Sequence, residues 1–166
     1  MAGVAVRRDV AKAFSNSGIE YFNTYAGNSV ACAIGDAVLD AIEQDHLQKN
    51  ALEVGNEMRS RLLQLQTKFP CMGDVRGVGL FLGVEFIKPN QTDSNDVGDT
   101  DIVPNGPLCK FVVDYLRYQR VITSRDGPDG NVLKLKPPLV FSLANLDQLM
   151  TSLEEALTVA EQSGKF

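Results

Sequence analysis

The chain has 166 residues, of which 44% are hydrophobic and 22% are charged, and its formal net charge is −5. This composition is typical of a globular protein with one domain, or with one domain and part of another. The acidic charge argues against nucleic acid as a partner. The apolar runs also fall well short of the roughly 20 residues that a membrane span needs.

The cysteines and the histidine bear on compartment and metal binding. Cys32, Cys71 and Cys109 lie far apart and outside any C-x-x-C pattern, which favours reduced thiols inside a cell. We therefore expect an intracellular protein, of the mitochondrial matrix or the cytoplasm. His46 stands alone, so we expect no zinc site. The acidic segment at residues 88–105 lacks the spacing of a calcium loop and is interpreted as a solvated loop.

The N-terminal residues contain an apolar run followed by a helical pattern. Residues 2–6 predict a buried strand, and residues 7–14 predict one short helix. A buried strand that begins at the second residue is unusual for a complete protein.

A candidate anion site follows this segment. A short aromatic run leads to Thr24, then to Gly27, and then to Asn28 or Ser29 as the N-cap of a helix. Amide groups and the dipole at a helix N-terminus favour phosphate, and a hydroxyl lies close by. The same pattern is common in turns that serve structure only, so the residues alone leave both interpretations open.

The middle of the chain predicts two helices and a glycine-rich β segment. Periodic apolar residues predict a helix over 28–44 and a second one over 47–69, which Pro70 ends. Residues 73–86 predict one bent strand or two consecutive strands. The spacing of the glycines is G-x-G-x-x-x-G, and no helix follows, so this is not a dinucleotide-binding loop.

The remaining residues predict a helix, a hairpin and a last helix. The helix spans 107–119, and the hairpin pairs 121–124 with 131–135 across a turn rich in Asp, Gly and Pro. Ser142 or Asn145 is expected to cap the last helix. That helix is predicted to bury one apolar stripe, made of Leu146, Leu149, Met150, Leu153, Leu157 and Ala160.

The run F-N-T-Y-A-G-N-S-V-A-C-A at residues 22–33 resembles the F-x-T-[FY]-[GA]-G-[NS] segment of class III (omega-type) aminotransferases. These are fold type I enzymes that depend on pyridoxal phosphate. The resemblance covers nearly the whole chain, including G-D-V-R-G-V-G-L at 73–80. Gly127-Pro128 and N-V-L-K-L-K-P-P at 131–138 resemble one branch most closely, that of alanine–glyoxylate aminotransferase 2-like proteins. This branch includes ethanolamine-phosphate and 5-phosphohydroxy-lysine phospho-lyases.

The resemblance implies a fold and a domain organisation. The fold class is α/β, and the small domain is α+β, with a small antiparallel sheet covered by helices. Residues 1–44 correspond to the end of the large pyridoxal-phosphate-binding domain and a connecting helix. Residues 45–166 correspond to the C-terminal small domain. The full-length enzyme is implied to be a homodimer that acts on a small-molecule amine or amino-phosphate substrate.

Two residues match functional positions of the family. Thr24 matches the threonine that hydrogen-bonds the cofactor phosphate of the neighbouring subunit. Lys134 occupies the position where many members have an arginine that clamps the substrate carboxylate. Because lysine lacks the bidentate fork of arginine, its presence slightly favours a phospho-lyase over a transaminase. The alternatives are that Thr24 is an ordinary turn residue and that Lys134 is a solvated strand lysine.

No catalytic residue is expected within this chain. In the family, the lysine that binds the cofactor lies in a K-x-x-G-N-G-x-P motif just before the segment that resembles residues 2–14, so Met1 would be an internal methionine. None of these lysines sits in a matching motif: Lys12, Lys49, Lys68, Lys110, Lys134 and Lys136. We therefore expect the chain alone to be inactive. The alternative function is a non-catalytic α+β interaction module, or a truncated product that binds full-length subunits.

Overall fold

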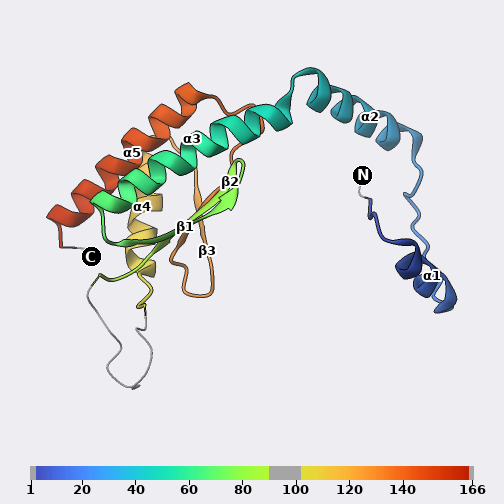
Figure 1. The fold of residues 1–166 in the computed structure, drawn as a ribbon, viewed down its shortest axis with the longest axis horizontal. Coiled ribbons are helices and arrows are strands. Elements are labelled where there is room, and N and C mark those ends of the chain that lie inside the picture. Colours follow the sequence, from blue (N-terminus) through green and yellow to red (C-terminus); the bar gives the residue numbers. More distant parts are fainter. Residues whose placement is uncertain (1–2, 90–101, 165–166) are drawn as a thin grey trace. The chain divides into compact units, whose positions relative to one another are not determined.

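A computed structural model describes residues 3–89 and 102–164, which divide into two compact units (Figure 1). Unit 1 runs from Met1 to His46 and unit 2 from Leu47 to Phe166. Unit 1 contains α1 (Arg8–Asn16) and α2 (Ser29–Gln44). Unit 2 contains α3 (Leu47–Lys68), β1 (Met72–Val78), β2 (Phe81–Phe86), α4 (Gly106–Tyr118), β3 (Ser124–Asp126), β4 (Val132–Leu135) and α5 (Leu143–Gln162).

Unit 1 has two helices and no buried residue among those that the structure describes. The prediction of a buried strand at residues 2–6 is wrong, because residues 3–7 form no strand and Val4 is 89% exposed. A strand needs a neighbouring strand for its backbone hydrogen bonds and an apolar cover for its side chains. The described part of unit 1 supplies neither. The helix predicted to follow is present as α1.

The four strands of unit 2 form one antiparallel sheet in the order β1-β2-β4-β3 (Figure 1). The glycine-rich segment forms two strands, β1 and β2, joined as a hairpin. Side chains alternate between the faces of a strand. Leu82, Val84 and Phe86 of β2 are therefore buried on one face, with Leu133 and Leu135 of β4.

The opposite face, called the polar face below, carries residues that lie in register across the sheet. Gly83 pairs with Arg76 of β1 on one side and with Lys134 of β4 on the other. Lys134 in turn pairs with Ser124 of the edge strand β3. Two cationic side chains thus flank a glycine on the same row of the polar face.

Helices cover the apolar face of the sheet. α3 packs on β1 and β2, α4 packs on β2, β3 and β4, and α5 packs on α3 and α4. This arrangement confirms a small antiparallel sheet covered by helices. The stripe predicted for α5 is buried. The largest fully buried side chains of the core are Phe69, Phe86, Met58, Leu62, Leu82, Leu108, Leu116, Leu133, Leu146, Leu153, Leu157 and Val84.

Capping residues define the starts of α4 and α5. The Asn105 side chain accepts a hydrogen bond from the Leu108 amide at 3.0 Å. At α5, Ser142 accepts from the Asn145 amide at 3.3 Å, and the Ser142 amide donates to the Asn145 side chain at 3.1 Å. Both residues expected as alternative caps of the last helix therefore act together in one capping box.

The edge strand β3 begins later than the sequence predicted. The predicted strand covers residues 121–124, but the observed strand is Ser124–Asp126. The Val121 amide donates to the Leu116 carbonyl at 2.8 Å, and Arg120 has a φ of 63°. This left-handed residue and its hydrogen bond close the end of α4, so Val121 is unavailable for pairing with a strand.

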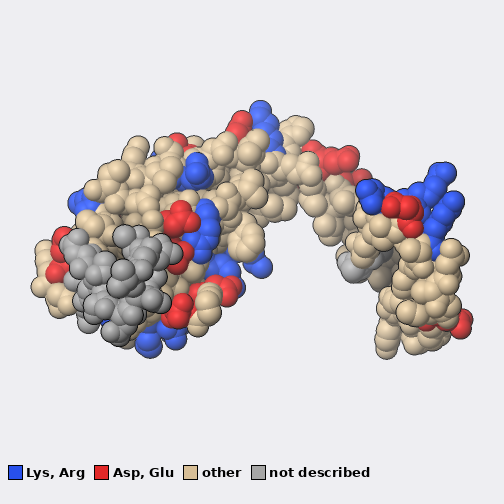
Figure 2. Space-filling model, turned by 60° about the horizontal axis from the view of Figure 1, so that its bottom comes forward, with Lys and Arg blue, Asp and Glu red and all other residues tan. Residues whose placement is uncertain are grey.

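Charged side chains of both signs lie next to one another over unit 2 (Figure 2). Two ion pairs link α3 to α5: Arg61 with Asp147 and Lys68 with Glu154, each at 2.5 Å. Exposed pairs of this kind contribute about 0–1 kcal/mol each.

Most of the acidic segment predicted as a loop lies outside the described residues. No described helix has the length and apolarity needed to cross a membrane.

Candidate functional site

Thr24 lies in an exposed turn that leads into α2. The Tyr25 amide donates to the Asn23 side chain at 2.9 Å, and the Ala26 amide donates to the Asn23 carbonyl at 3.0 Å. Gly27 follows with a φ of 71°, a left-handed conformation that favours glycine. These local bonds shape the turn and leave the Thr24 side chain in solvent.

The start of α2 suits one contact to a phosphate. Asn28 is the N-cap, because its side chain accepts a hydrogen bond from the Ala31 amide at 3.0 Å. Among the described residues, the Thr24 hydroxyl has no hydrogen-bond partner, so it is able to donate to a ligand. A hydroxyl beside a helix N-terminus is a suitable donor set for an anion. The residues present therefore fit the phosphate of pyridoxal phosphate through Thr24.

Lys134 lies on β4 in unit 2, whereas Thr24 lies in unit 1. The Lys134 Nζ lies 2.6 Å from Oδ2 of Asp126 on the neighbouring strand β3. The Gly127 amide donates to the other oxygen of Asp126 at 2.9 Å. The Lys134 ammonium, helped by this amide, holds the pKa of the Asp126 carboxyl below its usual range.

Two hollows lie beside Lys134. One is a hollow of about 360 Å³ on the polar face, and its lining includes Arg76, Gly83, Asp126 and Lys134. The other is a cleft of about 470 Å³ at the end of the sheet. The walls of the cleft include Arg120, Thr123, Lys134, Lys136, Phe141 and Asn145. Lys134 is the charged residue that the two linings share.

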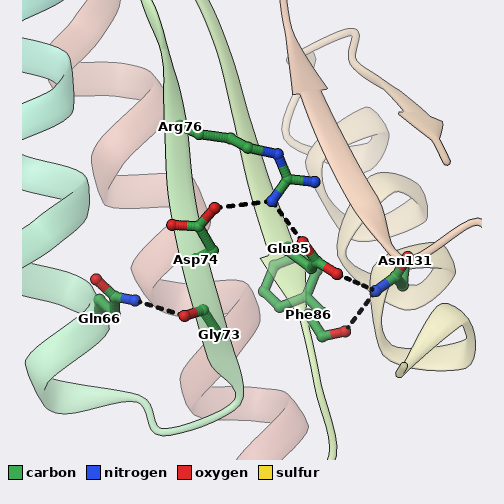
Figure 3. A network of polar contacts seen from close by, with 7 residues as sticks. All are labelled: Gln66, Gly73, Asp74, Arg76, Glu85, Phe86 and Asn131. Atoms are coloured by element: carbon green, nitrogen blue, oxygen red, sulfur yellow. Dashed lines mark hydrogen bonds and ion pairs between the residues drawn. The ribbon is translucent and has the colours of Figure 1, made fainter. Parts of the chain in front are cut away.

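Arg76 belongs to a polar network that extends from β1 to the start of β4 (Figure 3). Its guanidinium pairs with Asp74 at 2.8 Å and also with Glu85. The Asn131 amide group donates to Glu85 at 3.3 Å and to the Phe86 carbonyl at 3.1 Å. Asn131 is 2% exposed, so these bonds satisfy a buried polar group. Through its ion pairs with Asp74 and Glu85, Arg76 has a structural role that links β1 to β2.

Sequence reasoning missed Asp126 and the network partner Asn131. The sequence places Asp126 only in the turn of the predicted hairpin, and its partner Lys134 lies eight residues further along the chain. The hairpin register brings the two side chains together, and spacing alone does not reveal register.

Comparison with known proteins identifies the family. The model of the aminotransferase class-III family matches residues 1–157. The chain belongs to the class III aminotransferase family. A curated relative from Drosophila melanogaster, alanine–glyoxylate aminotransferase 2-like, is 37% identical over 163 residues, which is 98% of this chain and 31% of the relative. Ethanolamine-phosphate phospho-lyase homolog 1 of Caenorhabditis elegans is 34% identical over 160 residues, or 96% of this chain and 32% of the relative.

Solved structures of the class III family share the fold of this chain. A phospholyase from Arthrobacter, in complex with phosphoethanolamine, is 35% identical with a TM-score of 0.77, over 91% of this chain and 33% of that one. A transaminase with L-alanine is 31% identical with a TM-score of 0.70, over 93% of this chain and 34% of that one. The chain thus spans about a third of the length of these relatives.

Proposed function

We propose that this chain is the C-terminal part of a pyridoxal-phosphate-dependent class III enzyme that acts on a small amine or amino phosphate. The match to the family over residues 1–157 carries this proposal. In that enzyme, residues 1–44 form the end of the large domain and a connecting helix, and residues 45–166 form the small domain. The enzyme is a homodimer inside the cell, in the mitochondrial matrix or the cytoplasm.

Thr24 is proposed to bind the cofactor phosphate across the subunit interface. The exposed hydroxyl beside the start of α2 supports this role. Bound pyridoxal phosphate supplies the electron sink for chemistry at the carbon next to the substrate amine. The part of Thr24 is to orient that cofactor through a hydrogen bond to its phosphate.

Thr24→Val is expected to weaken cofactor binding in a family-length enzyme that carries this chain. Valine has the same shape but lacks the donor, and a hydrogen bond to a charged group contributes roughly 1.5–3 kcal/mol. Titration of the apoenzyme with pyridoxal phosphate measures the change. Thr24→Ser retains the hydroxyl and serves as the matched control. Equal cofactor affinity of the valine and serine variants would show that Thr24 is an ordinary turn residue.

Lys134 is proposed to lie at the substrate, and the enzyme is proposed to be a phospho-lyase. The lysine offers a compact charge without the bidentate fork that a substrate carboxylate fits. The similarity to the Arthrobacter phospholyase, whose structure contains phosphoethanolamine, supports the same choice. The alternative activity is that of a transaminase. The transaminase structure with L-alanine has a slightly lower identity to this chain, 31%.

The 166-residue chain alone is expected to form no stoichiometric covalent adduct with pyridoxal phosphate. No lysine of this chain matches the cofactor-binding motif, so none is held in position to react. Reduction of the mixture with borohydride, followed by peptide mass spectrometry, tests this expectation. A family-length enzyme treated in the same way is the control. One equivalent of pyridoxyl group on a single lysine of the chain would contradict it.

A second candidate function is a non-catalytic α+β module that binds full-length subunits. The observation that favours it is the pattern of exposure in unit 1, where apolar side chains such as Phe22, Tyr25 and Ile34 are more than half exposed. Exposed apolar patches mark interaction surfaces. Co-purification of the tagged chain with a family-length enzyme, accompanied by loss of its activity, would distinguish this function from the first.

A further inference from the structure

We infer that Asp126 is a positioning residue for Lys134 that disfavours a substrate carboxylate at this place. The inference rests on the role proposed above for Lys134 at the substrate. It adds the residue that fixes where the ammonium lies and how much charge it presents. The consequence is a preference for substrates whose end facing Lys134 bears no carboxylate, such as amino phosphates without an α-carboxylate.

The Asp126 side chain is held at both oxygens. Oδ1 accepts from the Gly127 amide at 2.9 Å, and Oδ2 lies 2.6 Å from the Lys134 Nζ. Asp126 is directly opposite Val132, so Lys134 is its diagonal neighbour across two adjacent strands. Diagonal neighbours in a sheet are within reach of long side chains. The register of the β3–β4 hairpin therefore brings the carboxylate to the ammonium.

The position of Asp126 decides on which side of β4 the ammonium is held. Lys134 lines both the hollow on the polar face and the cleft at the end of the sheet, whereas Asp126 lines the hollow only. Gly83 lies between Arg76 and Lys134 on one row of the polar face, and the Val132 side chain packs beside it, since a Cβ atom at Gly83 would lie 3.1 Å from that side chain. The ion pair thus draws Lys134 towards the hollow of about 360 Å³ on the polar face.

The charges around this hollow are already compensated. Lys134 pairs with Asp126, and Arg76 pairs with Asp74 and Glu85. A carboxylate that approaches Lys134 meets a neutral ion pair instead of a free cation, because repulsion by Asp126 offsets the attraction of the ammonium. It also finds one of the three ammonium donors already used. A substrate without a carboxylate at this end avoids both disadvantages.

The first test concerns the ion pair itself, independently of any substrate. In the 166-residue chain, carbon-13 NMR of the Asp126 carboxyl reports its pKa. Lys134→Met is expected to raise that pKa towards its ordinary value, because the partner that lowers it is removed. Lys136→Met is the matched control, since Lys136 lies two residues further along and its ammonium is 6.0 Å from the Phe81 ring centroid. An Asp126 pKa that is the same with and without Lys134 would overturn the inference.

The second test concerns selectivity, in a family-length enzyme that carries this chain. Asp126→Asn is expected to raise kcat/KM for alanine relative to phosphoethanolamine by about fivefold, the factor for removing one like-charge interaction near water. The change is expected in KM, with kcat nearly constant. Asp126→Glu keeps the carboxylate and is expected to retain the original preference. Asp129→Asn, at an exposed residue of the same turn, is the control and should leave the preference unchanged.

The variants separate failure of the inference from failure of the proposed function. If Lys134→Met changes KM but Asp126→Asn leaves the substrate preference unchanged, the inference about Asp126 is wrong and the role of Lys134 stands. If Lys134→Met changes KM for neither substrate, Lys134 does not bind substrate, and both proposals fall. A shift of the substrate preference towards alanine in Asp126→Asn, together with an unchanged preference in Asp126→Glu, supports the inference.

Discussion

Replacing Leu62 with alanine is expected to lower the free energy of unfolding of unit 2 by roughly 2–5 kcal/mol. Leu62 lies on α3 and is 0% exposed in the core. Truncation removes buried methyl groups and leaves a cavity, because the well-packed neighbours relax only partly. Urea denaturation followed by far-ultraviolet circular dichroism measures the change, since the chain has no tryptophan to report by fluorescence.

Leu52→Ala is the matched control for this prediction. Leu52 lies on the same helix but is 53% exposed, so its truncation removes much less buried area. The expected change is within about 0.5 kcal/mol, as for most surface substitutions. Equal losses of stability in the two variants would mean that α3 does not pack with the face that the structure buries.

The second large effect is expected for Gly55→Ala, which should lower the free energy of unfolding by roughly 3 kcal/mol. Two contributions oppose each other. Alanine favours a helix over glycine by about 1 kcal/mol, which alone would stabilise α3. The added Cβ, however, would lie 2.2 Å from the main-chain carbon and oxygen of Gly79 in the turn between β1 and β2. A backbone contact cannot be relieved by rotating a side chain, so the clash outweighs the gain in propensity.

Asn56→Ala is the control that isolates the helix contribution. Asn56 is the next residue of α3 and is exposed. Its replacement is expected to leave stability unchanged or to raise it slightly, because alanine is the better helix former. The same urea experiment serves both variants. A stabilised Gly55→Ala protein would refute the close approach of α3 to the turn at Gly79.

The long elements of unit 2 were predictable because a single periodic pattern defines each of them. The stripes of α3 and α5 repeat at three- and four-residue steps over whole helices, and the buried residues follow them. β4 was also placed within one residue. In these segments local propensity and tertiary burial favour the same structure.

The errors occurred where another part of the chain decides the structure. Apolar residues at 2–6 have the composition of a buried strand, but a strand forms only against a partner. Val121 is likewise an apolar residue that favours a strand, but its amide donates a hydrogen bond to the end of α4. In the candidate site, Thr24 and Lys134 were found by resemblance, and their functions remain predictions. Asp126 was missed because register across a hairpin, which no local pattern encodes, creates its contact with Lys134.

The burial of two cysteines has a consequence for chemical labelling of the chain. Cys71 and Cys109 lie in the core of unit 2, and burial raises the pKa of each thiol to about 12. The thiolate is the reactive form of cysteine, so both are poor nucleophiles at neutral pH. Cys32 is exposed on α2. A maleimide probe should therefore modify the native protein at Cys32 alone, which places one fluorophore in unit 1 without any engineered substitution.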